Sequence, residues 1–456
     1  MWLRERLHRR AKYGHVSANR LISLAFLGII LAGTLLLLLP ISTRSHTSSP
    51  FLTALYTATS ATCVTGLSLV DTYTHWSLFG QIVILCLIQI GGLGFMAIAS
   101  SLIFLVRGRV GMKQQLLMAQ SLGTPDFQGI VRMQKWMLHM AFLTEGIGAV
   151  LLTLRFLPEF GFARSLWLGV FHSVSAFCNA GFDILGFRSA GSSLITYGTD
   201  PFILLPVALL VIVGGLGYVV WEEIFTRRSW KKLSVYAKLV CLTTLALLIA
   251  GTLLVLVCEY HNPQTLGNLS FPQKLLAAFF QSVTLRTAGF SGIAQRELTE
   301  GGKAVSMFLM LVGGSSASTA GGLKTVTLVV ILLFLWSRMR GKPTVTVFHR
   351  TVPAGLVLNA LSIFGLMFSL AFAGAAVICM TSDLTFTEAC YETVSAIATV
   401  GLSCDASTRV SLIGKLLIIL YMYFGRVGVL TISLGFLHPS DMEPRYRYAD
   451  TQLLIG

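Results

Sequence analysis

Charged residues are scarce in this 456-residue chain: they make up 12% of it, whereas 54% of the residues are hydrophobic. Soluble domains carry about 25% charged residues, so the composition excludes an ordinary soluble protein and indicates a chain solvated largely by lipid. Acids are scarcer still, with 19 Asp and Glu against 34 Lys and Arg. Such an excess would suggest nucleic acid in a soluble protein. In a membrane protein an excess of basic residues first indicates which loops lie in the cytoplasm. We therefore expect no nucleic-acid partner.

Cysteine is also sparse, and no serine lies in a motif that sets it beside a base. The eight cysteines lack metal-ligand spacing and lie mostly in apolar runs, so we expect buried free thiols. A membrane-embedded hydrolase using Ser315 or Ser316 with His172 or His349 is the enzymatic alternative, and no motif supports it. We therefore expect no enzyme and no cofactor in this chain.

Long apolar runs recur along the sequence. The first follows a basic segment but is long for a signal peptide and lacks a cleavage site, so we expect a retained transmembrane helix. Runs that can cross a hydrocarbon core of about 30 Å lie near 21–40, 76–106, 136–157, 202–225, 236–258, 304–336, 354–380 and 411–437. Shorter apolar segments lie between successive pairs, near 50–62, 165–177, 273–284 and 385–397. Their length suits helices that enter the membrane and turn back.

The distribution of charge predicts the topology. Most Lys and Arg residues fall on one side of the membrane if the amino terminus is cytoplasmic. The positive-inside rule then predicts a multi-pass protein with both termini in the cytoplasm. Most acids fall in outer segments, where they are solvated singly or together concentrate cations at an outer mouth. Among them are Asp71, Asp183, Glu259, Asp383 and Asp405.

An internal repeat in the short segments is the strongest signal. Aligned on a shared glycine, they read YTATSATCVTGL (56–67), FHSVSAFCNAGF (171–182), FFQSVTLRTAGF (279–290) and YETVSAIATVGL (391–402). Ten positions before the glycine stands an aromatic residue: Tyr56, Phe171, Phe279 or Tyr391. Six positions before it stand Ser60, Ser175, Val283 and Ser395. The agreement predicts four structurally similar segments.

The chemistry of these segments predicts a cation filter. Glycine permits the positive φ that lets successive carbonyls face one axis, and a ring of carbonyls replaces the hydration shell of a cation. The carboxyl end of each short helix would add partial negative charge. Close helix packing is the alternative explanation, and it accounts poorly for four aligned segments. The expected filter residues are Val64, Thr65, Gly66, Asn179, Ala180, Gly181, Thr287, Ala288, Gly289, Thr399, Val400 and Gly401.

Glycines also mark the second long run of each unit. Gly91-Gly92 and Gly214-Gly215 fit ordinary close packing of helices. In the third unit, 313–324 interrupts an apolar run, and each glycine costs a helix about 1 kcal/mol relative to alanine. We therefore expect a broken helix and an intramembrane gating loop. Its residues are Gly313, Gly314, Ser315, Ser316, Ala317, Ser318, Thr319, Ala320, Gly321, Gly322, Leu323 and Lys324.

Arg426 lies in the middle of the last apolar run, where a charge costs about 2.5–3.5 kcal/mol to insert. It is either an electrostatic barrier below the filter or a structural partner of a carbonyl or an acid. The expected fold class is thus an all-α integral membrane protein. Four tandem helix–pore-loop–helix units surround one central pore, with eight transmembrane helices plus four re-entrant pore helices. The expected boundaries are a basic terminus at 1–20, pore units at 21–106, 107–225, 226–336 and 337–437, and a tail at 438–456 that could form a dimer contact.

These motifs resemble the membrane (pore) subunit of the bacterial Ktr potassium uptake system, within the Ktr/Trk/HKT superfamily. The resemblance runs from about Arg20 to the end of the chain. It rests on ATCVTGLSLVDT (61–72), LIQIGGLGFM (87–96), SAFCNAGF (175–182), LRTAGF (285–290), GGSSASTAGGLK (313–324), TVGL (399–402), FGRVG (424–428) and RYAD (447–450).

The resemblance implies potassium uptake across the bacterial cytoplasmic (inner) membrane, with potassium bound at the filter as substrate. It also implies a homodimer, a KtrA-like cytosolic ring that binds the regulatory nucleotide, and uptake stimulated by sodium. Arg426 matches the family's pore arginine. A serine at the first filter glycine accompanies sodium transport in this superfamily, so four glycines favour potassium. One departure is AGG at 320–322, which carries an additional glycine. The runner-up function is a secondary cation symporter working by alternating access.

Overall fold

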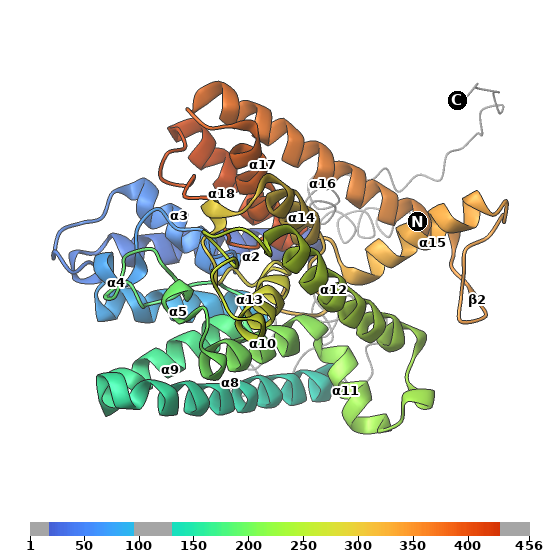
Figure 1. The fold of residues 1–456 in the computed structure, drawn as a ribbon, viewed down its shortest axis with the longest axis horizontal. Helices are drawn as coiled ribbons and strands as arrows, with labels where there is room; N and C mark the ends of the chain where they lie inside the picture. The colour runs from blue at the N-terminus through green and yellow to red at the C-terminus, as the bar shows by residue number, and fades with distance from the viewer. Residues whose placement is uncertain (1–17, 95–129, 429–456) are drawn as a thin grey trace, which may run out of the picture.

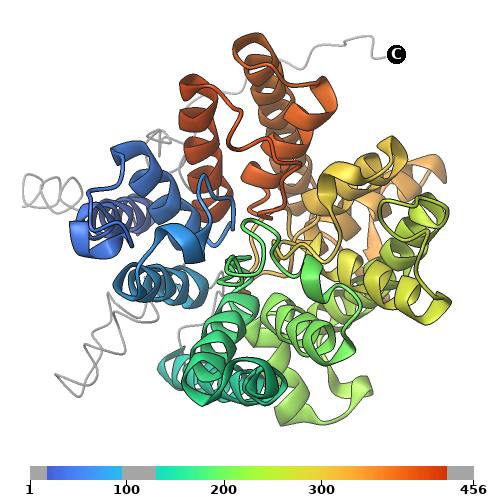
Figure 2. The same cartoon turned by 60° about the vertical axis from the view of Figure 1, so that its left-hand side comes forward.

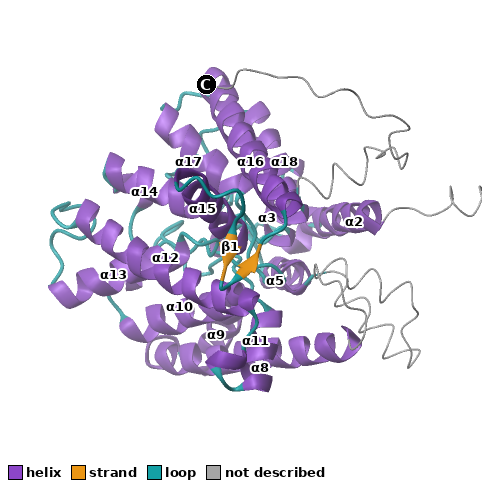
Figure 3. Cartoon of the chain, turned by 90° about the vertical axis from the view of Figure 1, so that its right-hand side faces the viewer, coloured by secondary structure: helices purple, strands orange, loops and turns teal. Residues whose placement is uncertain are grey.

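The computed structural model describes residues 18–94 and 130–428, and the regular secondary structure within them is almost entirely helical (Figure 3). The helices are α2 (Ala18–Leu38), α3 (Phe51–Thr62), α4 (Thr72–His75), α5 (Leu78–Leu93), α8 (Ile130–Phe160), α9 (Phe162–Phe177), α10 (Pro201–Leu216), α11 (Tyr218–Arg227), α12 (Val235–Glu259), α13 (Phe271–Thr284), α14 (Glu300–Leu311), α15 (Thr325–Met339), α16 (Ala354–Thr381), α17 (Phe386–Ile397) and α18 (Leu412–Val427). Short 3-10 turns are η1 (Pro40–Ser42), η2 (Ile195–Tyr197), η3 (Trp230–Lys232) and η4 (Gln295–Glu297). Strands β1 (Thr346–Val347) and β2 (Arg350–Thr351) pair antiparallel. The expected tail 438–456 and nearly all of 1–20 lie outside the described residues.

Four helices in the described part of the chain are long and apolar enough to cross a membrane. They are α2, α8, α12 and α16, which match the runs expected to open each unit. Their outward faces carry exposed apolar side chains, with Leu35 65%, Leu358 63% and Val257 77% exposed. Contiguous apolar surface of this kind is unfavourable in water and natural in lipid. The chain is therefore a multi-pass membrane protein.

The short helices α3, α9, α13 and α17 occupy the four segments expected to be re-entrant, within a few residues at each end. Two of them begin with capping boxes, formed by Ser270 with Gln273 and by Thr385 with Glu388. Unlike the long helices, the short ones are buried toward their carboxyl ends and bury several hydroxyl side chains there. Their carboxyl ends are therefore surrounded by protein.

The helices are arranged around a common centre. In Figure 2, the blue, green, gold and red parts of the chain surround a middle region into which connecting segments reach. Figure 1 shows α8 and α9 side by side along one edge and α16, α17 and α18 gathered at another. The α3, α9, α13 and α17 helices each pack against the long helix that precedes them. Neighbouring parts of the chain thus bring their short helices to the same region.

The second helix of each expected unit ends or breaks within its apolar run. The helix α5 ends at Leu93 and α18 at Val427, short of the expected ends of these runs at 106 and 437. The helices α14 and α15 are separated by the small-residue segment, as the sequence predicts. The helices α10 and α11 together are long and apolar enough for one span, but they are bent by 92° at Gly217, so the expected run 202–225 is a broken helix. The physical reason is the glycine backbone, because its φ of 88° is open to glycine and strained for other residues. The remainders of the expected runs, 95–106 and 429–437, lie outside the described residues.

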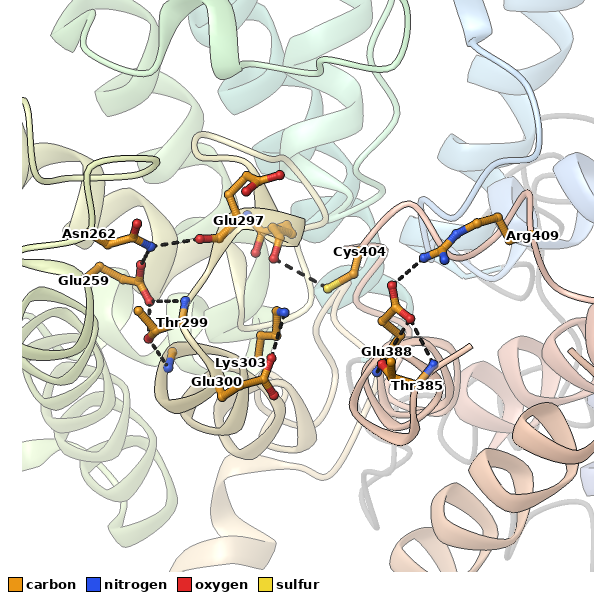
Figure 4. A network of polar contacts seen from close by, with 12 residues as sticks. Glu259, Asn262, Glu297, Thr299, Glu300, Lys303, Thr385, Glu388, Cys404 and Arg409 are labelled. Carbon is orange, nitrogen blue, oxygen red and sulfur yellow. Dashed lines mark hydrogen bonds and ion pairs between the residues drawn. The ribbon is translucent and has the colours of Figure 1, made fainter. Parts of the chain in front are cut away.

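A polar network ties together the loops around α12, α14 and α17 (Figure 4). The Glu259 carboxylate accepts hydrogen bonds from Asn262 Nδ2 at 2.7 Å, from Thr265 Oγ1 at 2.8 Å and from the Thr299 hydroxyl at 2.7 Å. Farther along, Arg409 pairs with Glu388 at 2.5 Å. A buried carboxylate with this many donors is well compensated, and its bonds join the end of α12 to the start of α14.

Candidate functional site

Each short helix runs directly into one of four glycine segments, 64–66, 179–181, 287–289 and 399–401. In every segment the first residue has positive φ: 56° at Val64, 58° at Asn179, 67° at Thr287 and 52° at Thr399. The glycine two positions later is again positive, between 68° and 98°. Positive φ is uncommon outside glycine. Its recurrence at the same position in all four segments marks one repeated backbone conformation.

The four glycines approach one another closely. A Cβ atom built on Gly66 would lie 2.6 Å from the Ala180 carbonyl oxygen, and one on Gly181 would lie 2.7 Å from Gly289 Cα. A Cβ on Gly289 would lie 2.6 Å from the Val400 oxygen, and one on Gly401 would lie 2.0 Å from the Thr65 oxygen. Each segment thus touches the next in chain order, and the last touches the first. The expected filter residues are brought together at one place.

The hydroxyls expected six residues before the glycines hold these segments in place. Ser60 Oγ accepts from the Gly66 N–H and Ser395 Oγ from the Gly401 N–H, each at 3.0 Å. Ser175 instead donates to the Phe182 carbonyl at 2.7 Å. These bonds satisfy backbone groups of the non-helical segments, which have no helical partner.

The third segment is one residue shorter than the alignment on glycine assumed. Thr284, and not Val283, supplies its hydroxyl, which donates to the Phe290 carbonyl at 2.7 Å. Likewise Phe280 is buried at 1% exposure, as its counterparts are, whereas Phe279 is only partly buried. The ungapped alignment therefore named the wrong residue at both positions. Thr284 directly follows Val283, and Phe280 directly follows Phe279. The expected hydroxyl and the expected aromatic residue are therefore both displaced by one position, which was the signal for a one-residue gap.

Several hydroxyls at the segments have no hydrogen-bond partner among the described residues. They include Thr65 Oγ1, Thr287 Oγ1 and Thr399 Oγ1, all buried. Unpaired buried hydroxyls are costly in a dry interior. A water or a cation at this place would satisfy them.

The glycine pairs of the second helices serve close packing, as one sequence interpretation held. A Cβ on Gly91 would lie 2.0 Å from the Thr62 carbonyl oxygen, and one on Gly214 would lie 2.0 Å from that of Phe177. Gly425 makes the corresponding approach to Ile397, at 2.2 Å. Each of these carbonyls belongs to the last residue of a short helix. The glycines let the second helix lie directly against that helix end.

Sequence reasoning missed a second use of glycine in the same helices. Gly94, Gly217 and Gly428 follow the packing glycines by three residues, have φ between 87° and 92°, and end α5, α10 and α18. The recurring spacing in GGLG (91–94), GGLG (214–217) and GRVG (425–428) was the available signal. Each break leaves helix carbonyls without partners from their own helix.

The 313–324 loop fills the space at these broken ends. The Ser315 N–H donates to the Gly215 carbonyl at 3.0 Å, and its hydroxyl donates to that of Leu216 at 2.5 Å. The Thr319 hydroxyl donates to the Phe177 carbonyl at 3.1 Å. The loop also reaches the fourth glycine segment, because a Cβ on Gly321 would lie 1.9 Å from Thr399 Oγ1. The loop is thus held against the side of the segments where the short helices end.

Arg426 joins this loop to the end of α5. Its guanidinium donates to the carbonyls of Thr319 and Gly91, and to that of Gly92 at 3.2 Å. Of the two roles considered from the sequence, these contacts match the one in which Arg426 is a structural partner of carbonyl groups. A cation is well placed there, because the end of a helix carries partial negative charge. Beside it, Lys324 Nζ donates to the Ala320 carbonyl at 2.7 Å.

Arg286 was not singled out from the sequence. It directly precedes the third glycine segment, is 7% exposed, and places Nη2 3.5 Å from Thr244 Oγ1 while its Nε has no partner among the described residues. It borders a small cavity. The other lining residues are Val211, Ile212, Gly215, Leu248, Val283 and Gly314.

Acidic side chains lie just beyond the second segment. Asp71 accepts from the Thr74 N–H at 2.7 Å and from the Gly191 N–H at 2.9 Å. Burial raises the pKa of Asp183 to about 6, opposed by the hydrogen bond from the Leu185 N–H and reinforced by the charge of Asp71. An acid with this pKa changes charge near neutral pH.

The residues of the hydrolase alternative are not assembled. His172 is buried and its Nδ1 lies 2.8 Å from the Leu168 carbonyl, whereas His349 is exposed beside the β1–β2 turn. The Ser315 hydroxyl is bonded to carbonyls. All eight cysteines are free, but only Cys63, Cys178 and Cys404 are buried, so the expectation of burial was too general. No group of three or more metal-binding side chains occurs in residues 18–94 and 130–428.

The fold and the site define a helical multi-pass membrane protein whose broken helices and converging glycine segments are typical of ion transport. Comparison with known proteins gives the family. The family model described as TrkH, cation transport protein, matches residues 22–446. The chain belongs to this family of cation transport proteins.

Curated relatives match over nearly their whole length. The potassium/sodium uptake protein NtpJ of Enterococcus hirae is 38% identical over 97% of this chain and 98% of its own. The Ktr system potassium uptake protein B of Bacillus subtilis is 36% identical over 98% of both chains. That of Vibrio alginolyticus is 36% identical over 96% of this chain and 94% of its own. The chain is thus a cation transport protein of the Ktr/Trk family, as the sequence motifs indicated.

A solved structure has the same fold. The crystal structure of the potassium transporter TrkH from Vibrio parahaemolyticus superposes with a TM-score of 0.70. The superposition covers 92% of this chain and 84% of the TrkH chain, at 17% sequence identity.

Proposed function

We propose that this chain forms a channel-like path for potassium uptake, built from four helix–pore-loop–helix units with the boundaries expected from the sequence. The observation that carries the proposal is the closed contact of four glycine segments that share one unusual backbone conformation. Alternating positive φ turns successive carbonyls to the same side of the chain. The selectivity filter is then made of the carbonyls at 64–66, 179–181, 287–289 and 399–401.

A carbonyl filter suits potassium because several weak oxygen ligands replace water without a fixed charge that would trap the ion. The four short helices aim their carboxyl ends at the filter and add negative potential. The unpaired hydroxyls of Thr287 and Thr399 supply further oxygen at its inner end. A glycine is present at all four positions, which favours potassium over sodium in this superfamily.

The path is closed by the 313–324 loop together with Arg426. The loop lies where the short helices end, and Arg426 fixes it to the opposite helix α5 through carbonyl oxygens. Opening requires these hydrogen bonds to break, and a cytosolic ring that binds nucleotide supplies the energy. The names of the Ktr relatives describe a multi-component system, which supports such a partner. We further propose a homodimer and stimulation by sodium.

Growth rescue tests the function. A bacterium that lacks potassium uptake should grow on low potassium when it expresses this chain with its cytosolic partner, and less well without that partner. A Gly401→Ala chain, present in the membrane at the same amount, is the matched control, since its Cβ would collide with the Thr65 oxygen. Absence of rescue by the intact pair would refute potassium uptake.

Bilayer recording separates the channel-like path from the alternating-access symporter, which the broken helices also permit. Unitary currents well above the turnover of a transporter would exclude alternating access. Rubidium flux without any resolvable current, in protein of the same preparation, would favour the symporter and overturn the channel-like path.

A further inference from the structure

Eight consecutive exposed residues, Phe225–Lys232, run from the last turn of α11 through η3. This basic–aromatic segment carries four cations at Arg227, Arg228, Lys231 and Lys232. Two large aromatic residues accompany them, with Phe225 49% and Trp230 51% exposed. Aromatic rings beside Lys and Arg are typical of the boundary between lipid and water.

The 92° bend at Gly217 gives the segment its orientation. The apolar helix α10 approaches the bend, and α11 leaves it almost at a right angle (Figure 1). If α10 lies along the membrane normal, α11 lies along the membrane surface. In that orientation Arg227, at the end of α11, and the cations that follow it lie at the level of the lipid headgroups.

The four cations are available to an external anion. None of them takes part in an ion pair within residues 18–94 and 130–428. The nearby acid Glu223 is turned to the start of α12, where it accepts from the Ser234 N–H at 2.8 Å. Arg227 Nη1 donates to the Lys232 carbonyl at 2.6 Å, which holds the segment in a compact turn. The clustered charge is complementary to an anionic lipid surface.

The same helix contacts the 313–324 loop at its other end. The Tyr218 N–H, in the first residue of α11, donates to the Ala317 carbonyl at 2.9 Å. The Tyr236 hydroxyl, from the start of α12, donates to the Ser316 carbonyl at 3.1 Å. The basic–aromatic segment connects α11 to α12, and each of these two helices makes one of the contacts to the loop. A displacement of this segment would therefore shift the helix ends that bind the 313–324 loop.

We infer that the basic–aromatic segment binds anionic phospholipid headgroups, and that this binding favours the loop conformation seen in the structure. The binding site stands on its own geometry. The effect on ion flow rests on the proposed function, in which that conformation is closed. Anionic lipid should then lower the flux of the chain without its cytosolic partner.

The binding is tested with the full chain in vesicles of phosphatidylcholine alone or mixed equally with phosphatidylglycerol. Brominated phosphatidylglycerol should quench Trp230 fluorescence more than brominated phosphatidylcholine does, with Trp230→Phe protein giving the background of the other tryptophans. A variant with Arg227→Gln, Arg228→Gln, Lys231→Gln and Lys232→Gln should lose this preference. The matched control neutralises Arg338, Arg340, Lys342 and Arg350 and should keep it. An unchanged preference in the first variant would overturn the lipid site.

The effect on flux is measured as rubidium uptake into the same vesicles. Phosphatidylglycerol should lower uptake by about fivefold or more, the lower end of ordinary coupling between sites. Neutralising the segment should remove this difference, and Tyr236→Phe should reduce it while the quenching persists. Equal flux in both lipids, with quenching intact, would overturn the coupling.

Two further outcomes are distinguishable. If no lipid gives rubidium flux but Trp230 quenching remains, the proposed function fails and the lipid site stands. If the neutralised variant keeps its lipid preference but no longer binds the cytosolic partner, the segment is a protein-docking surface and the inference is overturned.

Discussion

At the scale of single residues, the glycines of the four segments have two separate constraints. Their φ is positive, and the space where a side chain would stand is occupied by the neighbouring segment. Strained backbone costs about 1–3 kcal/mol when a residue other than glycine occupies it, and a contact with a carbonyl oxygen adds to that. Substitution should therefore change the filter even where the fold survives.

Gly66→Ser should lower discrimination of potassium over sodium, because its Cβ would push against the Ala180 carbonyl oxygen, a proposed ligand of the ion. The measurement is relative rubidium and sodium flux in vesicles. Gly28→Ser is the matched control, since nothing lies within 4 Å of a Cβ there. An unchanged ratio of the two ions would count against the filter assignment.

Arg426→Gln should raise uptake. A hydrogen bond to a charged group contributes about 1.5–3 kcal/mol, and this guanidinium makes several to carbonyls of α5 and the loop. Glutamine is too short to reach both sides, so the loop loses one attachment. Flux without the partner is the readout, with Arg338→Gln as the charge-matched control. Lower flux in a folded variant would show that Arg426 supports the open path instead.

Asp183 should make uptake depend on pH. Below its pKa of about 6 this carboxyl is mostly neutral, and above it the carboxylate adds negative charge at the outer mouth. Uptake at low potassium should therefore rise as the external pH increases through about 6. Asp183→Asn should flatten that rise. If the variant retains the same pH profile, another group is responsible.

At the scale of elements, the interruptions of the second helices explain where the loop is held. A continuous α10 would use its own N–H groups to bind the carbonyls of Gly214, Gly215 and Leu216. Because the helix stops, these carbonyls accept hydrogen bonds from Thr319 and Ser315 instead. The loop and the bend at Gly217 are therefore one structural unit.

Gly217→Ala should destabilise the protein by about 1–3 kcal/mol. The new Cβ would lie 2.4 Å from Ser315 Oγ, on a backbone with φ of 88°. Thermal unfolding in detergent measures the effect. Gly365→Ala, in an open part of α16, is the control and should stabilise slightly, by up to about 1 kcal/mol. Equal melting temperatures for the two variants would contradict the strain at the bend.

Shortening the 313–324 loop should increase flux, because fewer residues remain to fill the space beneath the segments. Removing 315–317 deletes the bonds to Gly215 and Leu216 while keeping Thr319. Rubidium uptake is compared with that of the intact chain at equal amounts in the membrane. A correctly inserted variant with low flux would indicate a purely structural loop.

At the scale of the whole molecule, the sequence predicted much of the architecture. The long helices α2, α8, α12 and α16 were evident because lipid requires an unbroken apolar run. The short helices were evident because four glycines recur with similar neighbours. The break at Gly217 was missed since a glycine in an apolar helix serves packing as readily as it ends the helix. The partners of Arg426 could not be read from the sequence, because they are backbone carbonyls and any residue type provides those.

The contact of the four glycine segments has a further consequence for how the protein tolerates change. Each segment contacts the next, and the last contacts the first, so the contacts form a closed ring. No segment lies at an end of this ring, where it could change conformation without moving a neighbour. A substitution in one segment should therefore displace the neighbouring segments as well. Sensitivity to substitution should then be alike at Gly66, Gly181, Gly289 and Gly401, even though they lie far apart in the sequence and differ in their neighbours.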